Sequence, residues 1–64
     1  MINSKFENVT SKFNNTNNYI IVKIINSKRT IYIVLNVLGT GTEIIFASNF
    51  KKNIQDFLNE KGSD

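Results

Sequence analysis

The residues of this sequence that could do chemistry are few and far apart. The chain has no histidine and no cysteine, so it lacks the commonest general base and the strongest thiol nucleophile. Its five carboxylates are scattered over 64 residues. We therefore expect a protein that is not an enzyme and that uses no cofactor and no small-molecule substrate.

Two carboxylates have a spacing that could hold a cation. Asp56 and Glu60 are four residues apart, which on a helix places both side chains on one face. Lys52 precedes Asp56 by the same spacing, and an exposed ladder of ion pairs is the commoner use of such a pattern. The usual zinc sites need His or Cys. We expect no metal site.

The stretch Gly39-Thr40-Gly41 is weakly similar to the loops that cradle phosphate groups. Such loops lead from a strand into a helix, whereas strands are predicted on both sides of this one. A hairpin turn explains the glycines, because they adopt a positive φ without strain.

Three strands are predicted in the middle of the chain. Residues 19–25, 29–38 and 42–47 are dense in β-branched and aromatic side chains, which suit a pleated surface. The connections at 26–29 and 39–41 are too short for a parallel crossover. The pattern predicts a three-stranded antiparallel meander.

A short helix is predicted before the strands. Ile2, Phe6, Val9 and Phe13 recur at spacings of three and four residues, as on one face of a helix. Ser4-Lys5-Phe6-Glu7 has the S-x-x-E form of a capping box. The run of Asn and Thr at residues 14–18 is expected to end this helix, because these side chains compete for backbone hydrogen bonds.

A second, amphipathic helix is predicted at the C-terminus. Its apolar stripe is Phe50, Ile54, Phe57 and Leu58, with Ser48 or Asn49 available as a cap and Gly62 at the expected end. The predicted fold is α+β, in the order α-β-β-β-α, with residues 1–64 forming a single domain.

The register of the hairpins predicts which face of the sheet is the core. With tips at Ser27-Lys28 and Thr40-Gly41, one face carries only apolar residues, and we assign it to the C-terminal helix. This face consists of Ile20, Val22, Ile24, Ile31, Ile33, Leu35, Val37, Ile44 and Phe46.

The opposite face is mixed, and two interpretations of it compete. In one, the N-terminal helix lays Phe6, Val9 and Phe13 across its tyrosines. In the other, both helices share the first face and this surface stays open as a contact site. It carries Tyr19, Ile21, Lys23, Ile25, Thr30, Tyr32, Val34, Asn36, Leu38, Glu43, Ile45 and Ala47.

The first functional hypothesis is a non-enzymatic protein-binding module that uses an open sheet face or a strand edge. A chain this short has a small core and is expected to be only marginally stable. Without cysteine or histidine it cannot gain stability from disulfides or the usual zinc sites, which leaves a protein partner or a second copy, as in a homodimer. Abundant Asn, Ile and Lys suggest an AT-rich genome, and the small size suits an inhibitor of the viral or mobile-element type. The predicted contact residues are Tyr19, Ile21, Lys23, Tyr32, Val34 and Ile45.

The alternative hypothesis is a nucleic-acid-binding protein. A basic edge would be made by Lys23, Lys28, Arg29, Lys51 and Lys52, with Tyr19 and Tyr32 as stacking platforms. The order α-β-β-β-α, with lysines opening the last helix, is similar to that of double-stranded-RNA-binding domains, and the resemblance implies RNA binding. Residues 50–55 depart from the family's Lys-Lys-x-x-x-Lys run, because they hold two lysines and no alanine.

Charge and targeting signals add little. The net charge of +3 is a mild bias that permits contact with nucleic acid without favouring it. The first residues hold no apolar core of the length that a signal peptide needs, and no stretch is long enough to span a bilayer. We expect a cytoplasmic protein without a membrane partner.

Overall fold

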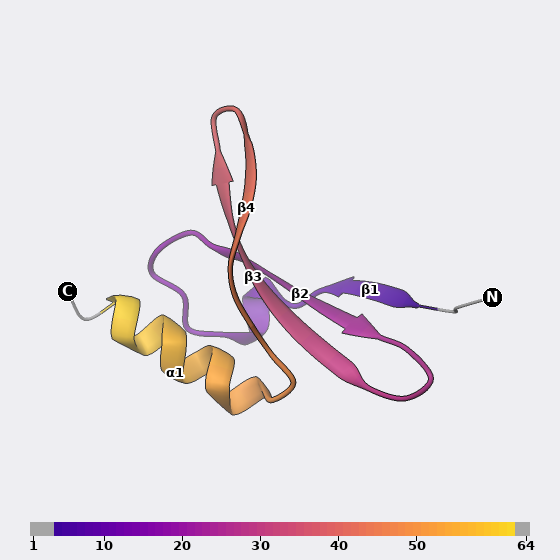
Figure 1. Ribbon diagram of the computed structural model, residues 1–64. Coiled ribbons are helices and arrows are strands. Elements are labelled where there is room, and N and C mark those ends of the chain that lie inside the picture. Colours follow the sequence, from indigo (N-terminus) through magenta and orange to yellow (C-terminus); the bar gives the residue numbers. More distant parts are fainter. Residues whose placement is uncertain (1–3, 63–64) are drawn as a thin grey trace.

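The computed structural model describes residues 4–62 and contains a four-stranded antiparallel sheet followed by one helix (Figure 1). The α+β class, the antiparallel sheet and the C-terminal helix are confirmed, but the prediction of three strands and an N-terminal helix is wrong. The sheet order is β1-β2-β3-β4. The elements are β1 (Lys5–Asn8), the 3-10 turn η1 (Thr10–Lys12), β2 (Ile20–Ile25), β3 (Thr30–Leu38), β4 (Gly41–Ser48) and α1 (Lys51–Gly62).

The segment predicted as an N-terminal helix forms β1 and η1 instead. β1 pairs with β2 from Lys5 opposite Ile25 to Asn8 opposite Val22, so Ser4 and Glu7 form no capping box. The Asn8 Oδ1 atom then accepts hydrogen bonds from the Thr10 backbone N–H (3.0 Å) and hydroxyl (2.7 Å). These local bonds turn the chain out of the strand. Ile2, the first residue of the predicted helix face, lies outside the described residues.

The register of the first hairpin is confirmed. Ile20 lies opposite Leu35, Ile24 opposite Ile31 and Ile25 opposite Thr30. The turn is held by Asn26, whose Oδ1 atom accepts from the backbone N–H groups of Lys28 and Arg29, both at 3.0 Å. An Asn side chain that bonds its own turn in this way is a common turn device.

The predicted register of the second hairpin is wrong. Its tip is Gly39-Thr40, so Leu35 lies opposite Ile44 rather than Phe46. The register then shifts between Leu35 and Val34, because Ile45 is an extra residue in β4. Such a bulge bends the strand and changes which way the following side chains point. Phe46 thereby lies opposite Val34 and on the same face as Val34.

The core lies on the face that the sequence prediction left as the open or mixed one. Ile21 and Val34 are completely buried there, together with Ile54 and Leu58 of α1. Val9 and Phe13, which flank η1, complete the six-residue core. The prediction that α1 packs on the uninterrupted apolar face is therefore wrong. Because both faces of this sheet are rich in apolar residues, strand alternation alone does not say which one the helix covers.

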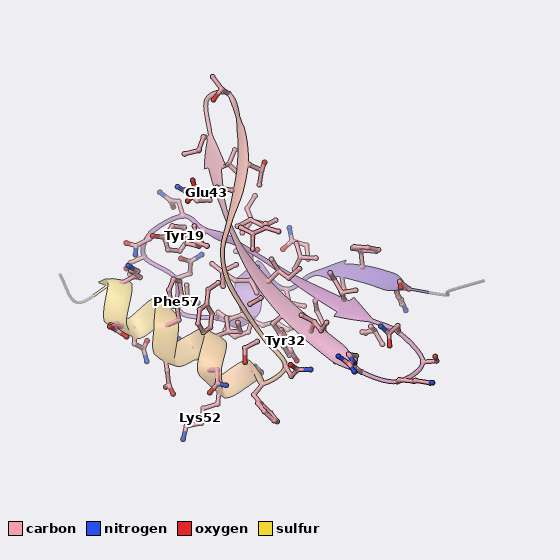
Figure 2. All side chains as sticks on the ribbon, viewed as in Figure 1. Tyr19, Tyr32, Glu43, Lys52 and Phe57 are labelled. Atoms are coloured by element: carbon pink, nitrogen blue, oxygen red, sulfur yellow. The ribbon has the colours of Figure 1, made fainter. Side chains whose placement is uncertain are left out.

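The N-terminal segment and α1 cover the same face of the sheet. Val9 continues the alternation of β1, which places it on the face of Glu7 and Lys23 and not on that of Phe6. Phe13 meets Tyr32 edge-on, with 6.2 Å between ring centres. From α1, Phe57 points towards β4 (Figure 2) and stacks on Phe46 at 4.4 Å. The opposite face of the sheet receives no element of the described chain.

The backbone of α1 lies closest to β3 and β4 of the sheet. In Figure 1 the distal part of the β3–β4 hairpin projects well beyond α1. Ser48, one of the two residues predicted as a cap, lies before α1, and its Oγ atom accepts at 3.2 Å from the backbone N–H of Phe50, which precedes the helix. Among residues 4–62, no helical segment has the length and apolar character needed to span a bilayer.

Candidate protein interface

The uncovered face of the sheet, which we call the open face, is the main candidate site. It is defined by the register of the three strand pairs, since directly opposed residues lie on the same face. Ile21 and Val34 are buried on the covered face, and their immediate neighbours along each strand point to the open face. The members of the open face are Phe6, Asn8, Ile20, Val22, Ile24, Ile31, Ile33, Leu35, Val37, Thr42, Ile44 and Ala47.

The open face is apolar and carries no charged side chain. Asn8 and Thr42 are its polar residues, and both lie on edge strands. The centre is made of half-buried aliphatic side chains that cover one another. The side chains at the margins of the face are more exposed to solvent: Phe6 is 69% exposed, Ile44 63% and Val37 56%. Monomers rarely leave a contiguous apolar surface of this kind in contact with water.

The structure brings the six predicted protein-binding residues together, but on the covered face. Ile21 and Val34 have no exposed surface. Tyr19, Tyr32 and Ile45 are partly buried and pack against the core. Lys23 is half-buried on the same face. A partner could reach at most the margins of this group without displacing α1.

Lysines and aromatic rings meet at one end of the covered face. The Lys23 Nζ atom lies 5.8 Å from the centre of the Tyr32 ring, and the Lys51 Nζ atom lies 5.8 Å from the centre of the Phe13 ring. Cations are attracted to aromatic faces at such distances. Both lysines line a hollow of about 90 Å³, together with Lys12, Val9, Phe13 and Tyr32.

The five predicted basic residues do not form one edge. Lys23 and Lys51 share the hollow, and the sequence prediction missed Lys12 as its third lysine. Lys28 and Arg29 lie at the turn between β2 and β3. Lys52 projects away from the sheet (Figure 2). The similarity to double-stranded-RNA-binding domains also loses its basis, because the element order begins with a strand where that family has a helix.

Sequence reasoning found most of the open face but gave it the wrong role. Eight of its residues belong to the uninterrupted apolar set that was assigned to the core: Ile20, Val22, Ile24, Ile31, Ile33, Leu35, Val37 and Ile44. Phe6 was missed, because its place depends on β1 pairing opposite Ile24. The absence of charged residues from this set could have indicated a contact surface, because the centres of interfaces lack charged residues just as cores do.

Comparison with protein-family models, curated proteins and solved structures gave no match. Within residues 4–62, no group of three or more His, Cys, Asp or Glu side chains is placed to hold a metal ion. The open face of the sheet and the lysine hollow are the two candidate sites of the described residues.

Proposed function

We propose that this chain is a non-enzymatic protein-binding module and that the open face is its binding surface. The observation that carries the proposal is the uncharged, apolar face that no element of the described chain covers, with Phe6 and Ile44 more than half exposed on it. Burying such a surface against a protein is favourable by about 25 cal/mol per Å² of apolar area.

The face is a better candidate than a strand edge. The edge strands are β1 and β4. β1 has only four residues and includes Lys5 and Glu7, and short edges with charged side chains resist pairing with another chain. A bulge interrupts β4 at Ile45, which also disturbs the row of backbone groups that a partner strand would need.

The proposal can be tested by photo-cross-linking in the cells that express the chain. A benzophenone amino acid replaces Phe6 in one variant and Phe50 in the control. Both phenylalanines are 69% exposed, but Phe50 lies between β4 and α1, outside the sheet. We expect a discrete protein adduct from position 6 and none of the same mass from position 50.

The mass of the adduct shows what covers the face. An adduct with a larger protein is expected if the chain acts as an inhibitor that blocks a target, and an adduct of twice the chain mass is expected if it binds itself. No adduct from position 6, or the same adducts from both positions, would contradict the proposal.

Binding of nucleic acid is a second candidate function, and the lysine hollow favours it. Lys12, Lys23 and Lys51 come from three different elements and converge beside the rings of Phe13 and Tyr32. Ammonium groups that contact phosphate and rings that stack on bases are the two components of single-strand binding. Glu7 lies opposite Lys23 on β1 and weakens the positive potential there, so we rank this function second.

A further inference from the structure

We infer that the partner of the open face is a second copy of this chain, and that two sheets pack face to face as a symmetric dimer. This inference rests on the proposed function, because it names the occupant of the same surface. Two antiparallel sheets that bury their apolar faces against each other, about 10 Å apart, form a common and stable arrangement. Three properties of the open face fit this occupant.

The first property is charge. The chain carries a net charge of +3, so two copies repel each other wherever their basic residues meet. The open face holds no charged residue among its twelve members. In a two-fold dimer each face meets its own copy, and a charge-free apolar face avoids any like-charge contact.

The second property is area. Neighbouring strands lie about 4.8 Å apart and side chains on one face recur about every 6.7 Å, so each side chain covers roughly 30 Å² of flat sheet. The twelve residues of the open face then cover roughly 400 Å² before the roughness of the surface is added. Two copies together bury on the order of 1,000 Å², which is the lower limit for a specific interface.

The third property is shape. β1 pairs with β2 only from Ile25 to Val22, and β4 pairs with β3 only from Leu38 to Tyr32. The face therefore extends towards Phe6 at one corner and towards Ile44 at the diagonally opposite corner. A half-turn about the diagonal that joins these two corners lays one elongated face along the other, so that Phe6 and Ile44 each lie against the second copy.

The size of the core makes such a dimer useful to the fold. Six of the residues from 4 to 62 are buried in the monomer, and domains of this length bury a smaller fraction of their surface than larger ones do. A second copy adds a second apolar layer without any change in the sheet. Stability should then rise with protein concentration, as it does for any fold coupled to association.

The test measures solution mass by sedimentation equilibrium for the wild type, Ile44→Lys and Leu38→Lys. Ile44 and Leu38 both lie in the exposed part of the β3–β4 hairpin, 63% and 45% exposed, but on opposite faces. We expect the wild type and Leu38→Lys to have twice the 7.3 kDa chain mass. For Ile44→Lys we expect the dissociation constant to rise at least roughly a hundredfold, because an ammonium group enters an apolar interface.

Three results would overturn the inference. They are a wild type that is monomeric over a roughly hundredfold range of concentration, equal dissociation in both variants, and an Ile44→Lys variant that stays dimeric. Circular dichroism of each variant shows whether the fold is intact. Should Ile44→Lys unfold, Phe6→Ser against Phe50→Ser replaces the pair and the same expectations apply.

Failure of the inference and failure of the proposed function are distinguishable. A monomeric wild type whose position 6 cross-links to a larger protein overturns self-association and supports a protein-binding face. A monomeric wild type with no adduct from position 6 overturns both.

Discussion

Gln55 and Asn14 are 41 residues apart in the chain and form a two-way hydrogen bond. The Gln55 Oε1 atom accepts from the Asn14 backbone N–H, and Gln55 Nε2 donates to the Asn14 carbonyl, both at 3.1 Å. The pair fastens the segment after Phe13 to α1, so that both can lie on the same face of the sheet. Gln55 thus links the N-terminal segment to α1, the two parts of the chain that cover the opposite side of the sheet from the open face.

Replacing Gln55 by Ala should lower the free energy of unfolding by about 1–2 kcal/mol, because three side-chain hydrogen bonds, two with Asn14 and one to the Asn59 Oδ1 atom, are lost at a partly exposed site. Gln55→Glu keeps an acceptor for the Asn14 N–H and loses the donor, so we expect an intermediate loss. Urea denaturation at one fixed protein concentration measures both. Equal stability of Gln55→Ala and the wild type would contradict this role.

The two faces of β2 and β4 should respond differently to the same truncation. Ile21→Ala opens a cavity in the core and should cost about 2–5 kcal/mol in the free energy of unfolding. Ile44→Ala removes a side chain that is 63% exposed and should cost less than about 1 kcal/mol in the dilute monomer. Denaturation at the lowest usable protein concentration gives the comparison. A similar loss of stability in both variants would contradict the assignment of Ile21 to the core face and of Ile44 to the open face.

Asn18 is the one non-glycine residue with a positive φ among those described, at 59°. Asn tolerates this left-handed region better than other residues, and a β-branched side chain does not. Asn18→Val should therefore destabilise the fold by about 1–3 kcal/mol, whereas Asn18→Gly should be close to neutral. Thermal unfolding of the two variants tests the prediction, which is wrong if the valine variant is as stable as the glycine one.

The lysine hollow makes a separate prediction about nucleic acid. If single-stranded RNA or DNA binds there, the logarithm of the affinity should fall with the logarithm of the salt concentration by about 0.7 for each phosphate contacted. Lys51→Gln should then reduce this slope, while the neighbouring Lys52→Gln should not, since Lys52 points away (Figure 2). Fluorescence titrations at several salt concentrations measure the slopes. Binding that is weak and insensitive to salt would remove this candidate.

The strands from Ile20 to Leu38 could be predicted from the sequence because their signals are local. Their β-branched composition predicts extended chain, and Asn26 with its neighbours predicts a tight turn whose length sets the register. The helix α1 was also predictable, since Ile54 and Leu58 recur at helical spacing and Gly62 marks its end. These patterns depend only on residues that are neighbours in the chain.

The first strand could not be predicted in this way. Lys5–Asn8 has one apolar residue, Phe6, and no β-branched side chain. It becomes a strand because it pairs with β2, which lies twelve or more residues further along the chain. The helical spacing of Phe6, Val9 and Phe13 was coincidental: in the strand Phe6 faces away from the core, while Val9 and Phe13 are buried in it.

The sequence alone determined that this chain builds strongly apolar strands joined by tight turns and ends in an amphipathic helix, because periodicity and turn chemistry are local properties. Tertiary structure alone decided which face of the sheet the helix covers. One extra residue in β4 carries Phe46 to the face of Val34, where it stacks on Phe57. Two hydrogen bonds between Gln55 and Asn14 fasten the segment after Phe13 to α1 on the same side of the sheet. Both depend on contacts between distant segments, and together they leave the more uniformly apolar face of the sheet uncovered by the described chain.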